Sequence, residues 1–157
     1  MLTEQEQREI AAERAHYEQP QAAAIEALKI VQAHRGWVSD EAVADIAAAL
    51  DTSTAAIDAV ATFYNLIYRQ PVGRHVIHVC DSVSCWLMGQ PRLLELLRAE
   101  LGIDLGQTTP DGRFTLLPTV CLGTCDRAPA MLVGRDTHRD LEGVDAQRLA
   151  TLLAAYE

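Results

Sequence analysis

The segment 75-HVIHVCDSVSC-85 decides the architecture of the C-terminal half of this chain. Its first five residues are rich in β-branched side chains, so they predict a strand that runs directly into Cys80. Cys85 follows after four residues, and a second pair, Cys121 and Cys125, lies in 121-CLGTC-125. The chain of 157 residues has only these 4 cysteines. The fold is therefore expected to bring two distant loops together around one object.

The number and grouping of the cysteines favour an iron–sulfur cluster. Four thiolates are the full ligand set of one [2Fe–2S] cluster. The residues between the cysteines are small or include glycine, 81-DSVS-84 and 122-LGT-124. A backbone that approaches inorganic sulfide and donates N–H groups to it requires such residues, and Gly123 is the clearest example. The sequence predicts that one [2Fe–2S] cluster is held by four ligands: Cys80, Cys85, Cys121 and Cys125.

Other sites built from cysteine fit the spacing less well. Structural zinc sites favour tight Cys-x2-Cys pairs, whereas four and three residues separate the cysteines here. A dithiol oxidoreductase would carry Cys-x-x-Cys at a helix N-terminus. His75 and His78 precede Cys80 and could serve a Rieske centre, but the cysteines already complete the set. A zinc-stabilised interaction module and a free ferredoxin that shuttles between partners remain the alternatives.

The composition limits the classes of partner and compartment. A formal net charge of −9 without a basic cluster argues against a nucleic-acid partner. No apolar run approaches the roughly 20 residues that span a bilayer, so direct membrane insertion is not expected. The N-terminus is acidic and lacks the apolar core of a secretory signal. We expect a cytoplasmic protein, whose clustered cysteines stay reduced and are suited to bind metal.

The first 71 residues predict helices only. Thr3 and Glu6 have the spacing of a capping box at the start of a helix that reaches about residue 17. A second helix is expected over about 20–34 and ends at Gly36. Ser39 is a suitable N-cap for a third helix, and a fourth opens at about 52–54. These segments predict a small helical bundle with its apolar faces inward.

The pattern changes after Pro71-Val72-Gly73. A helix is expected over about 90–101 and strands over 114–120 and 131–133, with a last helix over about 144–155. Pro118 places the second strand at a sheet edge or a bulge. With the strand that ends at Cys80, the order is β-α-β-β-α. We therefore expect an α+β chain with two domains, 1–71 and 72–157.

Aromatic and aliphatic residues cluster at the end of the helical half, in 63-FYNLIY-68. Such clusters usually form a core, and we interpret this one mainly as core of the helical bundle. The alternative is a surface that contacts a partner.

The chain resembles the 24-kilodalton-type [2Fe–2S] subunit of NADH–quinone oxidoreductase, respiratory complex I, from about residue 22 to residue 153. The likeness is dense in seven motifs: 36-GWVS-39, 61-ATFY-64, 71-PVGRH-75, 80-CDSVSC-85, 111-DGRFTL-116, 121-CLGTC-125 and 128-AP-129.

The resemblance implies that residues 72–157 form a thioredoxin-like ferredoxin domain and that the helices dock onto a flavoprotein subunit that binds NADH and FMN. The cluster would exchange single electrons with that FMN, in the peripheral arm on the cytoplasmic side of the inner membrane. NAD-linked hydrogenases and formate dehydrogenases carry the same module, so these complexes are further candidates. No Gly-x-Gly-x-x-Gly follows a predicted strand, which indicates an electron carrier without an NADH site of its own.

Overall fold

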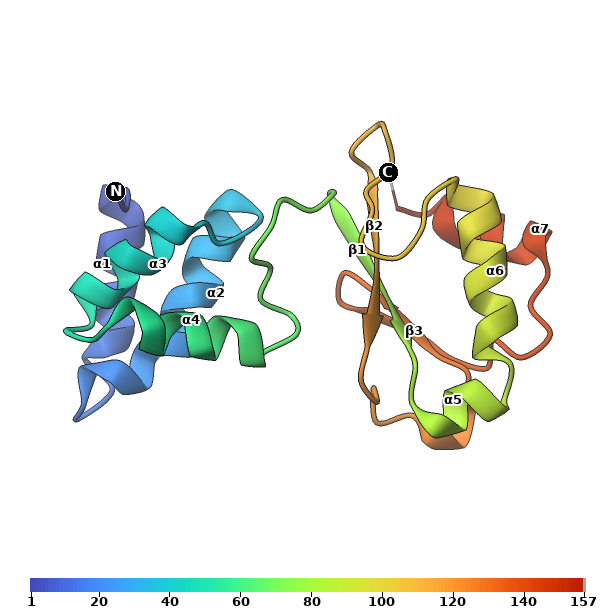
Figure 1. The fold of residues 1–157 in the computed structure, drawn as a ribbon, viewed down its shortest axis with the longest axis horizontal. Coiled ribbons are helices and arrows are strands. Elements are labelled where there is room, and N and C mark those ends of the chain that lie inside the picture. The colour runs from blue at the N-terminus through green and yellow to red at the C-terminus, as the bar shows by residue number, and fades with distance from the viewer. Residues whose placement is uncertain (157) are drawn as a thin grey trace. The chain divides into compact units, whose positions relative to one another are not determined.

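The computed structural model of the chain describes residues 1–156 and divides into two compact units, Met1–Pro71 and Val72–Glu157 (Figure 1). The first unit is helical, and the second contains all the strands in the described residues. The predicted fold class, α+β with helices preceding a sheet, is confirmed. Each unit has a buried apolar cluster of its own, so each is considered separately.

Side-chain caps define the helices of the first unit. Thr3, Ser39 and Ser53 each accept a backbone N–H bond, and Thr3 forms the predicted capping box with Glu6. Gly36 ends the second helix in the left-handed region, as predicted. The elements are α1 (Glu4–Arg14), the 3-10 turn η1 (Pro20–Ala23), α2 (Ala24–Arg35), α3 (Asp40–Ala49) and α4 (Thr54–Phe63).

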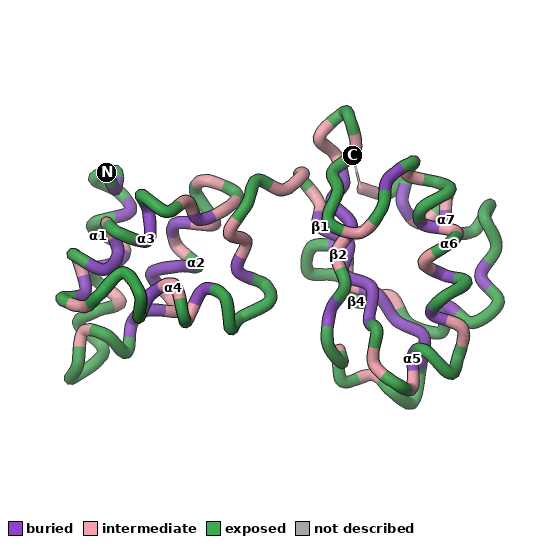
Figure 2. Tube along the Cα trace, viewed as in Figure 1, coloured by how far each residue is buried: buried purple, intermediate pink, exposed green. Residues whose placement is uncertain are grey.

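The core of the helical unit is aliphatic and includes residues that the helical spacing selects. Five of these side chains are at most 1% exposed: Leu28, Val31, Ile46, Leu50 and Ile57. Buried segments alternate with exposed ones around every helix (Figure 2), as expected of amphipathic helices that share one core.

A partly buried ion pair joins α1 to the end of α2. The Arg35 guanidinium donates to both carboxylate oxygens of Glu6, Nε to Oε1 at 2.7 Å and Nη2 to Oε2 at 2.6 Å. The Glu6 side chain is fully buried and also accepts the backbone N–H of Thr3 at 2.7 Å. Chiefly because of the bond from Arg35, the pKa of Glu6 falls from 4.5 to about 2.

The interpretation of segment 63–68 as core is largely wrong. Phe63 is 80% exposed, Tyr64 46% and Leu66 47%, while Ile67 is buried. The reason is a contact distant in sequence. Gln32 donates to the carbonyl of Leu66 at 2.8 Å and accepts the N–H of Tyr68 at 2.6 Å, which fixes the backbone against α2. With Ile67 turned inward, its neighbours are left on the surface.

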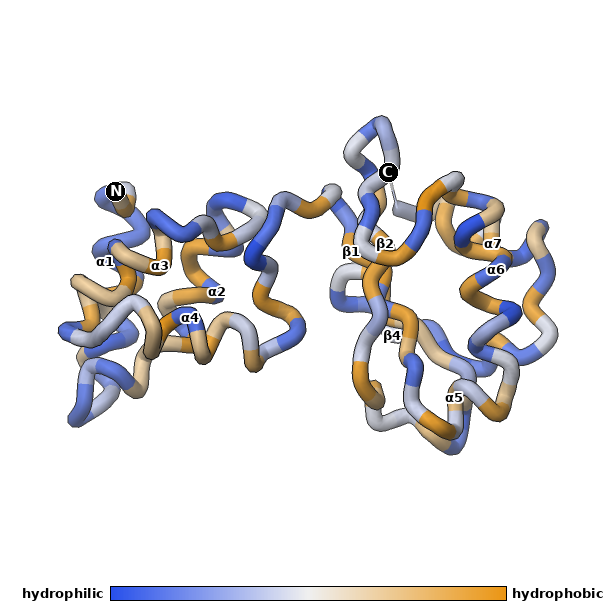
Figure 3. The backbone as a smooth tube through the Cα atoms, in the orientation of Figure 1, coloured by the Kyte–Doolittle hydropathy of each residue, from blue (hydrophilic) through white to orange (hydrophobic). Residues whose placement is uncertain are grey.

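The second unit contains a four-stranded sheet in the order β2-β1-β3-β4. Strand β2 is at the edge that Pro118 predicted, and Pro118 is exposed there. Apolar residues line β1, β2 and β3 (orange in Figure 3), whereas β4 is polar. The elements are β1 (His75–Cys80), α5 (Val83–Leu87), α6 (Gln90–Leu101), β2 (Phe114–Thr119), the 3-10 turn η2 (Cys125–Arg127), β3 (Met131–Val133), β4 (Asp136–His138) and α7 (Ala146–Leu153).

Helices α6 and α7 cover one face of this sheet (Figure 1). Leu97 of α6 and Leu149 of α7 are fully buried in one cluster with Ile77 of β1 and Leu116 of β2. The predicted order β-α-β-β-α lacks two short elements, α5 and β4. Neither carries an apolar period of its own, and β4 is formed by antiparallel pairing with β3.

The pairing of β1 positions the cysteine loops. Strand β1 is parallel to β2, with His75 opposite Phe114 and Cys80 opposite Thr119, and antiparallel to β3 on its other side. Gly73 precedes this pairing, and a Cβ there would lie 3.0 Å from the backbone of Gly112 and Arg113. A residue with a side chain at that position would push the two strands apart.

Among residues 1–156, no single helix is long and apolar enough to cross a membrane. Helices α3 and α4 reach the required length and composition only when they are taken together, across a bend of 117°.

Replacement of Glu6 by Gln is expected to lower the free energy of unfolding of the helical unit by about 2 kcal/mol, because the Arg35 charge loses its partner. The pKa of Glu6 is lower in the folded chain than in the unfolded one. Its stabilisation is therefore complete above about pH 5 and is lost as the pH falls towards 2. Urea unfolding across this range, followed by circular dichroism, measures both effects. The exposed Glu4 in the same helical turn is the control, and Glu4→Gln should leave the loss of stability at acid pH unchanged.

Candidate functional site

The two cysteine loops meet at one end of the sheet because the chain crosses the end of β1. Cys80 is the last residue of β1. The N–H of Asp81 donates to the carbonyl of Thr119 at 3.0 Å, and the N–H of Cys80 donates to that of Ala130 at 3.2 Å. The segment between Thr119 and Ala130 thus starts on one side of β1 and returns on its other side.

The second loop packs against the thiols of the first. Ala128 is buried in one cluster with Cys80 and Cys85, and Leu122, directly after Cys121, packs against that cluster. The structure therefore places the four cysteines singled out by sequence at one site. Among residues 1–156, no three cysteine, histidine or acidic side chains lie close enough to hold a single metal ion. A [2Fe–2S] cluster requires two sulfurs on each of two irons instead.

The four cysteines form one buried pair and one exposed pair. Cys80 and Cys85 are each 1% exposed and pack against Ala128. Cys121 and Cys125 are exposed, and their sulfur atoms are 3.3 Å apart. Each pair comes from one loop, which is the arrangement that two adjacent irons would need.

Within each pair, the two thiols have opposite pKa shifts. Burial raises the pKa of Cys80, but hydrogen bonds from Ser82 and from the N–H of Leu122 outweigh it and the pKa is lowered. The N–H of Gly123 is the main cause of the lowered pKa of Cys121.

The partner thiol in each pair is shifted upward. Burial and the neighbouring Cys80 raise the pKa of Cys85, and Cys121 raises that of Cys125. Two thiolates so close repel each other, so one proton is retained in each pair. Cations bound between them would remove this repulsion, and the donor set therefore fits a pair of irons.

Gly123 shapes the exposed pair. Its N–H donates to Cys121 Sγ at 3.3 Å, and its φ of 74° lies in the left-handed region. A Cβ at this position would meet no atom within 4 Å, so the backbone angle and not space requires glycine.

Exposed apolar side chains adjoin the cysteines in sequence. Val83, Trp86 and Leu87 of α5 are 59–70% exposed, and Val120, directly before Cys121, is 69% exposed. Sequence reasoning missed α5 as an element. The apolar residues of 83-VSCWLM-88 were the available signal, because exposed apolar side chains beside the ligands indicate a surface that contacts a partner.

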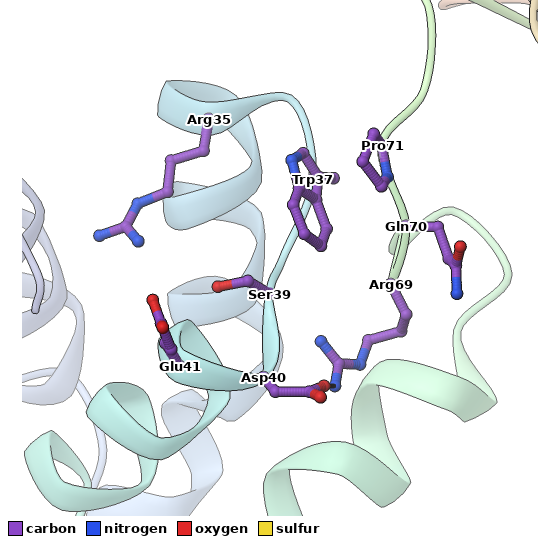
Figure 4. Close-up of a pocket in the computed structure, with 8 residues that line it drawn as sticks. All are labelled: Arg35, Trp37, Ser39, Asp40, Glu41, Arg69, Gln70 and Pro71. Carbon is purple, nitrogen blue, oxygen red and sulfur yellow. Dashed lines mark hydrogen bonds and ion pairs between the residues drawn. The ribbon is translucent and has the colours of Figure 1, made fainter.

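A pocket of about 660 Å³ lies in the helical unit, away from the cysteines in sequence (Figure 4). Trp37 and Pro71 lie on one side of it, and Asp40 extends toward Arg69. Arg69 is paired with Asp40 at 2.5 Å and with Asp58 at 3.0 Å. Because these two carboxylates neutralise the Arg69 guanidinium, the pocket is not suited to bind an anion.

Comparison with known proteins gives the family of the chain. The family model of the thioredoxin-like [2Fe-2S] ferredoxin matches residues 10–157. The chain belongs to the thioredoxin-like [2Fe-2S] ferredoxin family. As a member of this ferredoxin family it is an iron–sulfur protein, and the thioredoxin-like character implied by the resemblance is confirmed.

Two curated relatives are, by name, subunits of NADH-quinone oxidoreductase. The one from Pseudomonas aeruginosa is 52% identical over 156 residues, which are 99% of this chain and 92% of the relative. The one from Escherichia coli K12 is 54% identical over 140 residues, which are 89% and 84%. These relatives confirm the resemblance to the [2Fe–2S] subunit of an oxidoreductase complex.

A solved structure shares the fold of this ferredoxin. An NAD+-reducing [NiFe]-hydrogenase in the H2-reduced state matches 85% of the chain with a TM-score of 0.69 and 29% sequence identity. The match covers 22% of the hydrogenase chain, so the ferredoxin corresponds to about a fifth of that chain.

Gly123→Ala is expected to strain the loop by about 1–2 kcal/mol and to weaken retention of iron, because the N–H bond to Cys121 depends on the left-handed backbone. Iron content after gel filtration measures retention. Gly106 is the matched control outside both cysteine loops, because its φ is 82° and an added Cβ would meet no atom within 4 Å. Equal iron loss from Gly106→Ala would show that general destabilisation and not the loop is responsible.

Proposed function

We propose that this protein is the electron-transfer subunit of an NADH–quinone oxidoreductase. Cys80, Cys85, Cys121 and Cys125 hold one [2Fe–2S] cluster, which exchanges single electrons with the FMN of a partner flavoprotein that binds NADH. The observation that carries the proposal is the convergence of the two loops, which brings four thiols in two pairs to the end of β1. The two relatives from NADH-quinone oxidoreductase, similar over 99% and 89% of the chain, support the choice of complex.

The division of labour follows from electron counting. NADH gives up two electrons as a hydride, whereas a [2Fe–2S] centre carries one. A flavin on the partner separates the two electrons, and the chain has no dinucleotide fingerprint with which to bind NADH itself. Full thiolate ligation favours a low midpoint potential, around −400 mV for plant-type centres.

Both units offer apolar surface for a partner. The exposed residues Phe63, Tyr64 and Leu66 belong to the helical unit, and Trp86 and Leu87 adjoin the cysteines. Exposed aromatic residues are enriched at protein interfaces. This surface supports docking of the helical unit, residues 1–71, onto the flavoprotein. The proposed place of the subunit is the peripheral arm, on the cytoplasmic side of the membrane.

The decisive experiment is metal analysis and electron paramagnetic resonance of the purified chain. About two irons and two acid-labile sulfides per chain are expected, with a signal after reduction by dithionite. Cys121→Ala should lose most of the iron, because the chain has no spare cysteine. Equimolar zinc without visible absorption would establish the zinc module instead, and normal iron in Cys121→Ala would remove that residue from the ligand set.

Phe63→Ala is expected to weaken binding to the flavoprotein about tenfold or more, since a buried aromatic anchor typically contributes over 1 kcal/mol. Binding of the iron-loaded variant to the flavoprotein subunit, measured by titration calorimetry, tests this. Tyr17, 38% exposed in the same unit, provides the control variant Tyr17→Ala. Unchanged affinity in Phe63→Ala would exclude this surface from the interface.

A further inference from the structure

Ser82 occupies the N-cap position of α5 but does not cap it. Its φ of −68° and ψ of 161° are the extended values of an N-cap, yet its side chain makes no cap hydrogen bond. Thr3 has the same backbone angles, and Ser39 and Ser53 have similar ones; all three accept an N–H bond from their helices. Serine is favoured at this position because of that bond, so its loss at Ser82 calls for another partner.

The hydroxyl of Ser82 is directed to sulfur instead. Its Oγ lies 3.2 Å from Cys80 Sγ. A thiolate that binds iron has no proton to donate, so in the loaded protein the hydroxyl is the donor to Cys80.

We propose that Ser82 is a positioning residue whose hydroxyl donates to the Cys80 thiolate and raises the midpoint potential of the cluster. This inference rests on the proposed function, because it requires the four cysteines to hold a [2Fe–2S] cluster. It goes beyond that function by assigning control of the potential to a side chain that is not a ligand.

The direction of the effect follows from charge. Reduction adds one negative charge to the cluster and its ligands, and a donor directed at the sulfurs stabilises the more negative state more strongly. The half-buried position of Ser82 and the burial of Cys80 and Cys85 limit screening by water. Backbone donors such as the N–H of Gly123 act in the same direction, whereas the Ser82 contribution can be removed by changing a side chain.

The test is a redox titration of the loaded full chain, monitored by electron paramagnetic resonance. In Ser82→Ala the equilibrium constant for reduction should fall about tenfold, which lowers the midpoint by roughly 59 mV for one electron. Ser82→Thr retains a hydroxyl and should return the midpoint towards the wild-type value. Ser53→Ala makes the same chemical change at the N-cap of α4; it should lower stability and leave the midpoint unchanged.

A second measurement separates a hydrogen bond from a structural role. Iron–sulfur stretching bands in resonance Raman spectra shift in deuterated water when exchangeable donors contact the ligands. That shift should shrink in Ser82→Ala and persist in Ser82→Thr. Ser82→Gly, which removes the hydroxyl without adding atoms, is the second variant without a donor if Ser82→Ala fails to fold.

The outcomes distinguish this inference from the proposed function. A loaded Ser82→Ala with the wild-type midpoint and deuterium shift overturns the role of Ser82 and leaves the function standing. Variants without a donor that fold but cannot be loaded assign Ser82 to assembly of the site and also overturn the inference. A wild-type chain that binds no iron–sulfur cluster overturns the proposed function itself.

Discussion

The site depends on the position of β1 between a parallel and an antiparallel neighbour. Parallel pairing aligns the carboxyl ends of β1 and β2, so Cys80 lies opposite Thr119 and both cysteine loops start at the same edge. Antiparallel pairing with β3 then draws the second loop back across the end of β1, to the bond between Cys80 N–H and the Ala130 carbonyl. Because the register is anchored by the core under α6 and α7, a slip by one residue would bury the wrong face and separate the thiols.

Those parts of the fold that depend on local patterns could be predicted. Short runs of sequence predicted three such features: the strand that ends at Cys80, the helix over 90–101, and the caps at Thr3 and Ser39. The convergence of the loops followed from the cysteine spacing alone. What the spacing could not supply was the strand order, and with it the reason that one pair is buried and the other exposed.

The parts that escaped prediction are set by contacts distant in sequence. Strand β4 is polar and short, and only its pairing with β3 makes it a strand. Segment 63–68 has the composition of a core, but Gln32 fixes its backbone so that Phe63 and Tyr64 face outward. Serine at position 82 has the sequence signature of a cap, and only the folded loop shows that its hydroxyl is directed to sulfur.

The unequal burial of the two cysteine pairs determines the side from which an electron partner can approach. Cys80 and Cys85 are enclosed, whereas Cys121 and Cys125 reach the surface beside Val120. An electron partner can approach closely only from the exposed side, and apolar neighbours there let the contact exclude water and lower the local dielectric. The same enclosure keeps the buried pair in a fixed geometry while the partner binds and leaves. Burial therefore holds the ligands in place, and exposure gives the partner access.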